Sequence, residues 1–199
     1  MKTNIILAGV GGQGILTIAA VLDTAALSEN LHVKQSEVHG MSQRGGAVQC
    51  HVRISDKEIF SDLIPEGKAD LILSVEPMEL LRYMPFLNKY GWLVTDSHPF
   101  INTDNYPEKN DLFEQIKKHP YHVIINATEI AKKIGNSKTA NMVLLGAASS
   151  IIPLSEKSML EAIKKLFQHK SDKIINLNLE AFFEGKKIAK EMTDLAAKN

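Results

Sequence analysis

Glycines at a fixed spacing near the N-terminus are the first residues of this sequence that could do chemistry. The segment NIILAGVGGQGI (residues 4–15) places Gly9, Gly11 and Gly14 in the spacing G-x-G-x-x-G, with Gly12 as an additional glycine. Such glycines allow a tight turn, a close approach of backbone to phosphate, and close packing of a helix on a strand. The free N–H groups and the positive dipole end of a following helix favour an anion. The loop therefore predicts phosphate binding, and a purely structural role in the turn remains the alternative.

A dinucleotide-binding loop would also need an acidic residue about 20 residues further on, at the end of the second strand. That place holds Lys34, Gln35 and Ser36, and Glu37 follows only slightly later. The sequence therefore disfavours an independent NAD-dependent dehydrogenase.

A second polar segment, SEVHGMSQRGGAVQ (residues 36–49), could complete an anion site. Arg44 precedes two glycines, so a guanidinium and exposed N–H groups could surround an anion, and Ser42 and Gln43 add neutral donors. If the second strand lies beside the first, this segment leaves the sheet at the same edge as the glycine loop. A polar turn with no ligand is the alternative, and His39 alone is weak evidence for catalysis.

Composition and missing motifs limit the chemistry of the chain. Lys and Arg balance Asp and Glu at 23 each, so the net charge predicts no binding to nucleic acid or to a membrane. The single cysteine, Cys50, excludes an internal disulfide and a cluster of iron held by about four cysteines of this chain. No P-loop, nucleophile elbow, zinc-protease motif or thiamine-diphosphate motif occurs. We find neither a signal peptide nor a spanning segment of about 18 apolar residues, and we expect a cytoplasmic protein.

The elements that must position the two loops begin in a β-α-β rhythm. Residues 4–8 predict a buried strand, the apolar spacing after the glycines predicts a helix to about residue 29, and residues 31–38 predict a second strand. Residues 47–54 alternate between apolar and polar side chains and follow after a short connection, which favours antiparallel pairing. We expect residues 59–64 to complete a hairpin with them, with His51 and Arg53 on a solvated or partner-facing side.

The remaining sequence resumes the alternation and then becomes helical. Further strands are predicted at 69–76, 91–97 and 122–128, with a helix from Pro77 to about residue 89 and a loop plus a short helix within 99–120. Gly135 is a natural helix stop, and Ser155 is a candidate N-cap. Residues 138–152 predict a buried helix, and a last helix is expected at about 178–196.

Three motifs in this order resemble one family. GVGGQGI near the N-terminus, SEVHGMSQRGGAVQCHVR about thirty residues later, and NMVLLGA (141–147) are similar to the gamma-type component of 2-oxoacid:ferredoxin oxidoreductases, and most similar to the small subunit of the indolepyruvate enzymes. The resemblance covers essentially the whole chain. Elements and resemblance together predict an α/β, Rossmann-like three-layer sandwich: a mostly parallel sheet, an antiparallel hairpin insertion and a helical C-terminal part, in one gamma-type domain over residues 1–199.

The resemblance implies a division of labour between subunits. In this family thiamine diphosphate decarboxylates a 2-oxoacid, iron–sulfur clusters pass electrons to ferredoxin, and coenzyme A accepts the acyl group. Those cofactors would belong to a larger partner subunit, so this chain would hold no tightly bound cofactor, no metal and no catalytic residue, and would be inactive alone. Coenzyme A is its candidate ligand, with its diphosphate and 3′-phosphate shared between the two loops. The residues implied are Gly9, Gly11, Gly12, Gln13, Gly14, Ser42, Gln43 and Arg44.

Two further interpretations remain open on the sequence. The chain could be a stand-alone nucleotide- or coenzyme-A-binding regulatory module, including a homodimer when isolated. The preference for indolepyruvate or another aryl-pyruvate is also less fixed than the family, because pyruvate and 2-oxoglutarate enzymes would use a similar small subunit.

Overall fold

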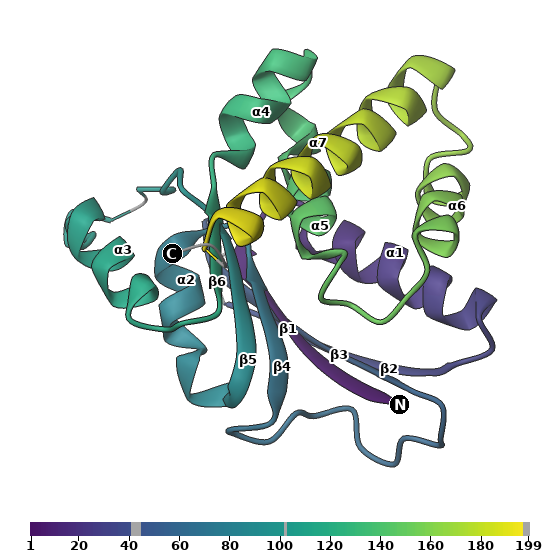
Figure 1. Cartoon of the computed structure of the whole chain (residues 1–199), viewed down its shortest axis with the longest axis horizontal. Coiled ribbons are helices and arrows are strands. Elements are labelled where there is room, and N and C mark those ends of the chain that lie inside the picture. The colour runs from purple at the N-terminus through teal and green to yellow at the C-terminus, as the bar shows by residue number, and fades with distance from the viewer. Residues whose placement is uncertain (41–44, 102, 197–199) are drawn as a thin grey trace.

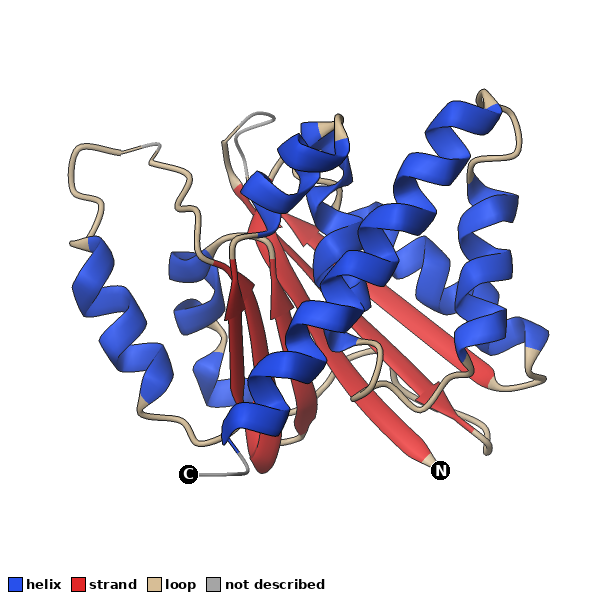
Figure 2. Ribbon diagram, turned by 45° about the horizontal axis from the view of Figure 1, so that its top comes forward, coloured by secondary structure: helices blue, strands red, loops and turns tan. Residues whose placement is uncertain are grey.

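Six strands form one mixed sheet that carries helices on both faces (Figures 1 and 2). The computed structural model describes residues 1–40, 45–101 and 103–196. The strand order across the sheet is β2-β3-β1-β4-β5-β6. The strands are β1 (Lys2–Val10), β2 (His32–His39), β3 (Ala47–Ser55), β4 (Ala69–Ser74), β5 (Leu87–Asp96) and β6 (His122–Ile125).

The larger part of the sheet is parallel, as the predicted α/β rhythm requires. β1, β4, β5 and β6 run side by side, with Ile5 opposite Leu71 and Leu73 opposite Val94. The carboxyl ends of these strands therefore meet at one edge, where ligands bind in open α/β sheets. The N-terminus lies at the opposite, lower edge in Figure 2.

The remaining part is antiparallel, and its order corrects one expectation. β3 pairs antiparallel with both β1 and β2, so the second strand does not lie beside the first. β3 runs between them, with Val52 opposite both Ile5 and Gln35. The short connection from β2 to β3 is the antiparallel link that the sequence predicted.

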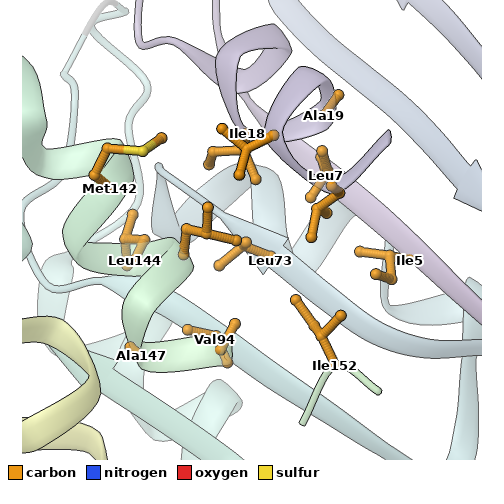
Figure 3. Packing of buried hydrophobic residues seen from close by; sticks show 14 of the residues in the cluster. Ile5, Leu7, Ile18, Ala19, Leu73, Val94, Met142, Leu144, Ala147 and Ile152 are labelled. Carbon is orange, nitrogen blue, oxygen red and sulfur yellow. The ribbon is translucent and has the colours of Figure 1, made fainter. Parts of the chain in front are cut away.

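Helices cover the two faces unequally. α1, α4, α5, α6 and α7 pack on one face around the larger hydrophobic cluster, whereas α2 and α3 cover the other face around Leu80 and Ile116. Figure 3 shows the larger cluster, in which Leu7 and Leu73 of the sheet share the core with Ile18 of α1 and Leu144 of α5. The helices are α1 (Ile15–Ser28), α2 (Pro77–Arg82), α3 (Lys109–Lys117), α4 (Ala127–Ile134), α5 (Ala140–Ala148), α6 (Glu156–Leu166) and α7 (Asp172–Ala196), with 3₁₀ turns at Met84–Phe86 and Ser137–Thr139.

Local signals in the sequence fix several helix ends. The Ser155 side chain accepts a hydrogen bond from the Ser158 N–H at the start of α6, and Gly135 ends α4 with φ 103°. These are the cap and the stop that the sequence predicted. The helix from Pro77 was expected to reach residue 89, but it ends at Arg82, because Pro85 cannot continue an α-helix and lies in the 3₁₀ turn that follows.

The predicted hairpin between residues 47–54 and 59–64 is wrong. Residues 56–68 form a loop in which side chains of β3 bind the backbone: Arg53 Nη1 donates to the carbonyl oxygens of Ser61 (2.7 Å) and Leu63 (3.0 Å), and the Ile64 N–H donates to His51 Nδ1 (2.9 Å). β3 offers no free edge to a further strand, because β1 and β2 pair with it on both sides.

No helix in the described part of the chain has the length and hydrophobicity to cross a membrane.

Candidate anion-binding site

The glycine loop joins the end of β1 to the start of α1, as the sequence predicted. Gly12 and Gly14 have φ of 97° and 80°, in the left-handed region that glycine adopts at little cost. A side chain at Gly14 would also place its Cβ 2.5 Å from Asn141 Nδ2, whereas the space around Gly12 is open. Backbone conformation alone thus requires glycine at residue 12, and both conformation and packing require it at residue 14.

Hydrogen bonds hold the loop in this shape. The Gln13 N–H donates to the Val10 carbonyl (3.2 Å), and the Val10 N–H donates back to Gln13 Oε1 (2.8 Å). Asn141 Nδ2, from the first turn of α5, donates to the Gly14 carbonyl (3.1 Å). Gln13 and Asn141 therefore brace the turn, and the NMVLLGA motif is explained in part because its asparagine contacts the GVGGQGI motif.

The loop presents donors to any anion at this edge. Within the described residues, the Gly12 and Gly14 N–H groups have no hydrogen-bond acceptor. The first turn of α1 carries no acidic side chain, so its positive dipole end is not neutralised by its own residues. These are properties of an anion site at a helix N-terminus.

The second loop ends beside the glycine loop, and its two stems are joined to each other. The Gly11 N–H donates to the Gly46 carbonyl (2.9 Å), and the Gly40 N–H donates to the Ala47 carbonyl (2.8 Å). β3 rather than β2 makes this contact, because β3 is the neighbour of β1. The predicted donors Ser42, Gln43 and Arg44 lie outside the described residues.

Two buried carboxylates end the neighbouring strands, and sequence reasoning missed both. Glu76 follows β4 and is completely buried; it accepts hydrogen bonds from the Glu79 N–H (2.8 Å), the Phe100 N–H (3.4 Å) and the Tyr106 hydroxyl. Burial raises the pKa of Glu76, and the Tyr106 hydrogen bond opposes that rise. An acidic residue directly after an apolar strand and before a proline was the signal available in the sequence.

Asp96, the last residue of β5, is likewise a buried carboxylate that accepts several hydrogen bonds. It accepts hydrogen bonds from the His98 N–H (3.0 Å), the Ala127 N–H (3.1 Å), the Thr128 N–H (3.1 Å) and the Thr128 hydroxyl (2.6 Å), and burial raises its pKa. Both carboxylates thus fasten loops and helix N-termini at this edge. Across the described ranges, no group of three or more His, Cys, Asp or Glu side chains is arranged to hold a metal ion.

The expectation that His51 and Arg53 face solvent or a partner is wrong. They are 5% and 8% exposed, because the loop at residues 59–64 covers their side of β3. His51 also packs edge-on against the Phe86 ring at 5.5 Å. Burial lowers the pKa of His51; the Asp62 carboxylate opposes this, and the Arg53 guanidinium adds to it.

Cys50, on the other side of β3, is fully buried. Burial raises the pKa of its thiol to about 12, and the negative charges of Asp23 and Glu37 contribute. A thiol in this state neither reacts readily nor ligates a metal. The structure therefore gives the chain's single cysteine a packing role.

Comparison with known proteins identifies the family. The model of the pyruvate ferredoxin/flavodoxin oxidoreductase family matches residues 4–188. The indolepyruvate oxidoreductase subunit IorB of Thermococcus kodakarensis is 40% identical over 202 residues, covering 96% of this chain and 98% of the relative. IorB of Archaeoglobus fulgidus is 39% identical over 194 residues, covering 93% and 94%. The ketoisovalerate oxidoreductase subunit VorA of Methanothermobacter marburgensis is 30% identical over 92% of this chain but only 36% of its own length.

Solved structures share the fold. The gamma subunit of a keto/oxoacid ferredoxin oxidoreductase from Geobacter sulfurreducens is 26% identical with a TM-score of 0.69, covering 95% of this chain and 99% of that one. The 2-oxoglutarate:ferredoxin oxidoreductase of Magnetococcus marinus has a TM-score of 0.78 at 24% identity; the match covers 96% of this chain and 31% of that one. The chain belongs to the pyruvate ferredoxin/flavodoxin oxidoreductase family and is a gamma-type subunit of a 2-oxoacid:ferredoxin oxidoreductase.

Proposed function

We propose that this chain is the small subunit of an indolepyruvate or other aryl-pyruvate:ferredoxin oxidoreductase, and that it helps to bind coenzyme A. The similarity to IorB subunits over nearly the full length of both chains supports the substrate class. The Magnetococcus marinus enzyme, which shares the fold, was solved with 2-oxoglutarate, coenzyme A and succinyl-CoA bound. The reaction class is oxidative decarboxylation of a 2-oxoacid to an acyl-CoA.

The observation that carries the coenzyme A proposal is the hydrogen bond from the Gly11 N–H to the Gly46 carbonyl, since it holds the two predicted anion-binding segments together. The Gly12 and Gly14 N–H groups and the N-terminus of α1 would bind one phosphate group. Ser42, Gln43 and Arg44, between β2 and β3, would bind another. Gly9, Gly11 and Gln13 would shape the loop that presents these donors.

Thiamine diphosphate and iron–sulfur clusters would supply the decarboxylation and the electron transfer from a larger partner subunit. Cys50 does not fit an iron–sulfur cluster, because its thiol is buried with a pKa of about 12, and no group of three or more His, Cys, Asp or Glu side chains in the described residues is arranged to hold a metal ion. Under this proposal the chain has no turnover by itself, and ferredoxin acts on the complex. Within the complex, its own residues would orient coenzyme A through backbone N–H groups.

Coenzyme A affinity of the complex tests the role of Arg44. We expect Arg44→Ala to weaken binding about tenfold at low salt and less at high salt, because a charge-assisted contact to phosphate is screened by ions. Lys118→Ala, which removes an exposed positive charge just after α3, is the matched control and should leave affinity unchanged. Equal affinity of the Arg44→Ala complex and the unaltered complex at both salt concentrations would remove Arg44 from the site.

Co-purification from the native cells tests the subunit assignment. A tagged chain should recover a larger protein that contains thiamine diphosphate and iron–sulfur clusters, and the complex should reduce an acceptor dye with indolepyruvate and coenzyme A. Recovery of the chain alone, or as a homodimer that binds coenzyme A, would favour the regulatory module instead. A complex that turns over pyruvate or 2-oxoglutarate but not an aryl-pyruvate would correct the substrate.

A further inference from the structure

The edge of the sheet opposite the glycine loop holds a buried cation that the proposed function does not use. Arg53 lies near the C-terminal end of β3, opposite Asn4 of β1, and is 8% exposed. Burying a charge is costly unless the charge is paired. The partners of this guanidinium therefore decide what the site can do.

All the acceptors around Arg53 are neutral. Arg53 Nε donates to Asn4 Oδ1 (3.0 Å), and Nη1 donates to the carbonyl oxygens of Ser61 and Leu63. Within the described residues, no carboxylate lies within 4.0 Å of the guanidinium, and Nη2 has no hydrogen-bond partner. Nη1 thus holds the loop and Nε binds β1, while Nη2 and the positive charge of the guanidinium remain available to a ligand.

Two cavities meet at this residue. The larger, of about 570 Å³, is lined by Arg53 together with Lys2, Lys57 and the Phe60 ring. The second, of about 460 Å³, is lined again by Arg53 and Lys2, and also by Lys68. Both volumes are in the range of small-molecule sites, about 300–1,000 Å³.

The charge of the larger cavity is positive. Asp56 and Glu58 are its carboxylates, and Asp56 is already paired with the N-terminal amino group. The second cavity contains the Asp70 carboxylate, whose oxygens accept hydrogen bonds from the Asn4 N–H and from Asn88 Nδ2. In each cavity the cationic groups outnumber the carboxylates by two, which matches a dianion.

Phe60 adds an apolar wall to the larger cavity. Its side chain is 86% exposed although the neighbouring Ile59 is buried. Lys34 Nζ, from β2, donates to the Phe60 carbonyl at 3.4 Å and so supports this part of the loop. An exposed aromatic ring at the mouth of a cationic cavity can stack on a planar group of a ligand.

We propose that this cavity binds a small phosphomonoester that carries an aromatic ring, of the nucleoside monophosphate class. Arg53 Nη2, Lys2 and Lys57 bind the phosphate, and Phe60 stacks on the base. The site lies at the beginning of β1, whereas the glycine loop lies at its end, so the two sites can be occupied independently. The proposal stands on Arg53 and its cavities and does not depend on the coenzyme A assignment.

Titration of the full chain with AMP, adenosine and inorganic phosphate tests this inference, with binding followed by amide chemical shifts. We expect AMP to bind with a dissociation constant of about 1 mM or below at low salt. Adenosine and phosphate should each bind at least fivefold more weakly, and the shifts should fall on residues 53–61. Absence of saturation by AMP, or shifts confined to the glycine loop, would overturn the proposal.

The test uses variants of exposed residues, because an Arg53 variant would also lose the hydrogen bonds that hold the loop at Ser61 and Leu63. Lys57→Gln should weaken AMP and phosphate about threefold each, whereas Phe60→Ser should weaken AMP about fivefold and leave phosphate unchanged. Lys118→Gln, at the exposed residue just after α3, is the matched control for loss of one positive charge. AMP affinity that is the same in Lys57→Gln, Phe60→Ser and Lys118→Gln would contradict the assignment.

Discussion

Gly146 of α5 lies directly against the backbone of Phe182 in α7: a Cβ atom at residue 146 would stand 1.9 Å from the Phe182 carbonyl oxygen. Gly185 of α7 repeats the relationship, because its Cβ would stand 1.8 Å from the Val143 carbonyl oxygen. Two glycines, one from each helix, thus let α5 and α7 pack at backbone distance. The Phe182 side chain is fully buried at this crossing.

Gly146→Ala should therefore destabilise the protein by about 3 kcal/mol, at the upper end of the cost of overpacking, because backbone and not a flexible side chain must move. Urea unfolding of the purified chain measures the change in the free energy of unfolding. Ser150→Ala, at an exposed residue just after α5, is the control and should change it by less than about 0.5 kcal/mol. A Gly146→Ala protein as stable as the control would show that the helices can separate without cost.

Gly12→Ala and Gly14→Ala distinguish conformation from packing in the glycine loop. Gly12→Ala should cost about 1–2 kcal/mol, since only the positive φ opposes it. Gly14→Ala should cost more, because its Cβ would also displace Asn141 and break that side chain's bond to the Gly14 carbonyl. Thermal unfolding of both variants shows which one loses more stability. Combining Asn141→Ala with Gly14→Ala should recover part of the stability that Gly14→Ala loses. Equal costs for the two glycine variants would contradict the packing role of Asn141.

Asp23 makes stability depend on pH. Burial raises the pKa of Asp23 from 3.8 to about 6, and its buried Oδ1 has no hydrogen-bond partner among the described residues. The folded state therefore binds this proton more tightly than the unfolded state. Below pH 4 the side chain is a neutral carboxyl and costs little; ionisation destabilises the fold as the pH rises from about 4 to 6, and the full penalty remains above pH 6.

Asp23→Asn should consequently raise the free energy of unfolding at pH 7 by on the order of 1–3 kcal/mol and have little effect below pH 4. Denaturant unfolding at several pH values measures this difference. Asp104→Asn, at an exposed residue, should show no such pH dependence. A gain that is equal at pH 4 and pH 7 would mean that the charge of Asp23 is not the cause.

The hydroxyl of Tyr106 fastens the loop between β5 and α3 to Glu76. Tyr106→Phe removes one donor from a completely buried carboxylate, which should cost about 1–3 kcal/mol at pH 7. The loss should be smaller in acid, because the pKa of Glu76, already raised by burial, would rise further and the group would take up a proton. Unfolding at pH 7 and pH 4.5 measures both effects. Tyr90→Phe, at a residue that is 69% exposed, should leave stability unchanged at either pH.

The pattern of β3 shows how much of this fold the sequence could predict. Its alternation correctly marks Val48, Cys50, Val52 and Ile54 as one buried face. It cannot show that residues 59–64 fold back over the other face, because that contact depends on His51 and Arg53 binding backbone groups of a loop. An alternation of apolar and polar residues shows which face of a strand is buried, but it does not show which segment covers the opposite face.

The candidate site was predictable to a similar extent. Glycine spacing and the strand-to-helix context locate the loop, since both are local properties of the chain. The bracing by Asn141 and the contact with Gly46 connect residues far apart in sequence, and no local pattern encodes them. The order of the three motifs nevertheless predicted the family, and the family model, which matches residues 4–188, confirms this prediction.

The position of β3 has a consequence for how such subunits can diversify. Because β3 is hydrogen-bonded on both sides, both stems of the segment between His39 and Ala47 belong to continuous ladders. The surrounding scaffold can then keep its register when the length or charge of that segment changes. One framework could in this way carry segments of different sequence at the same edge of the sheet.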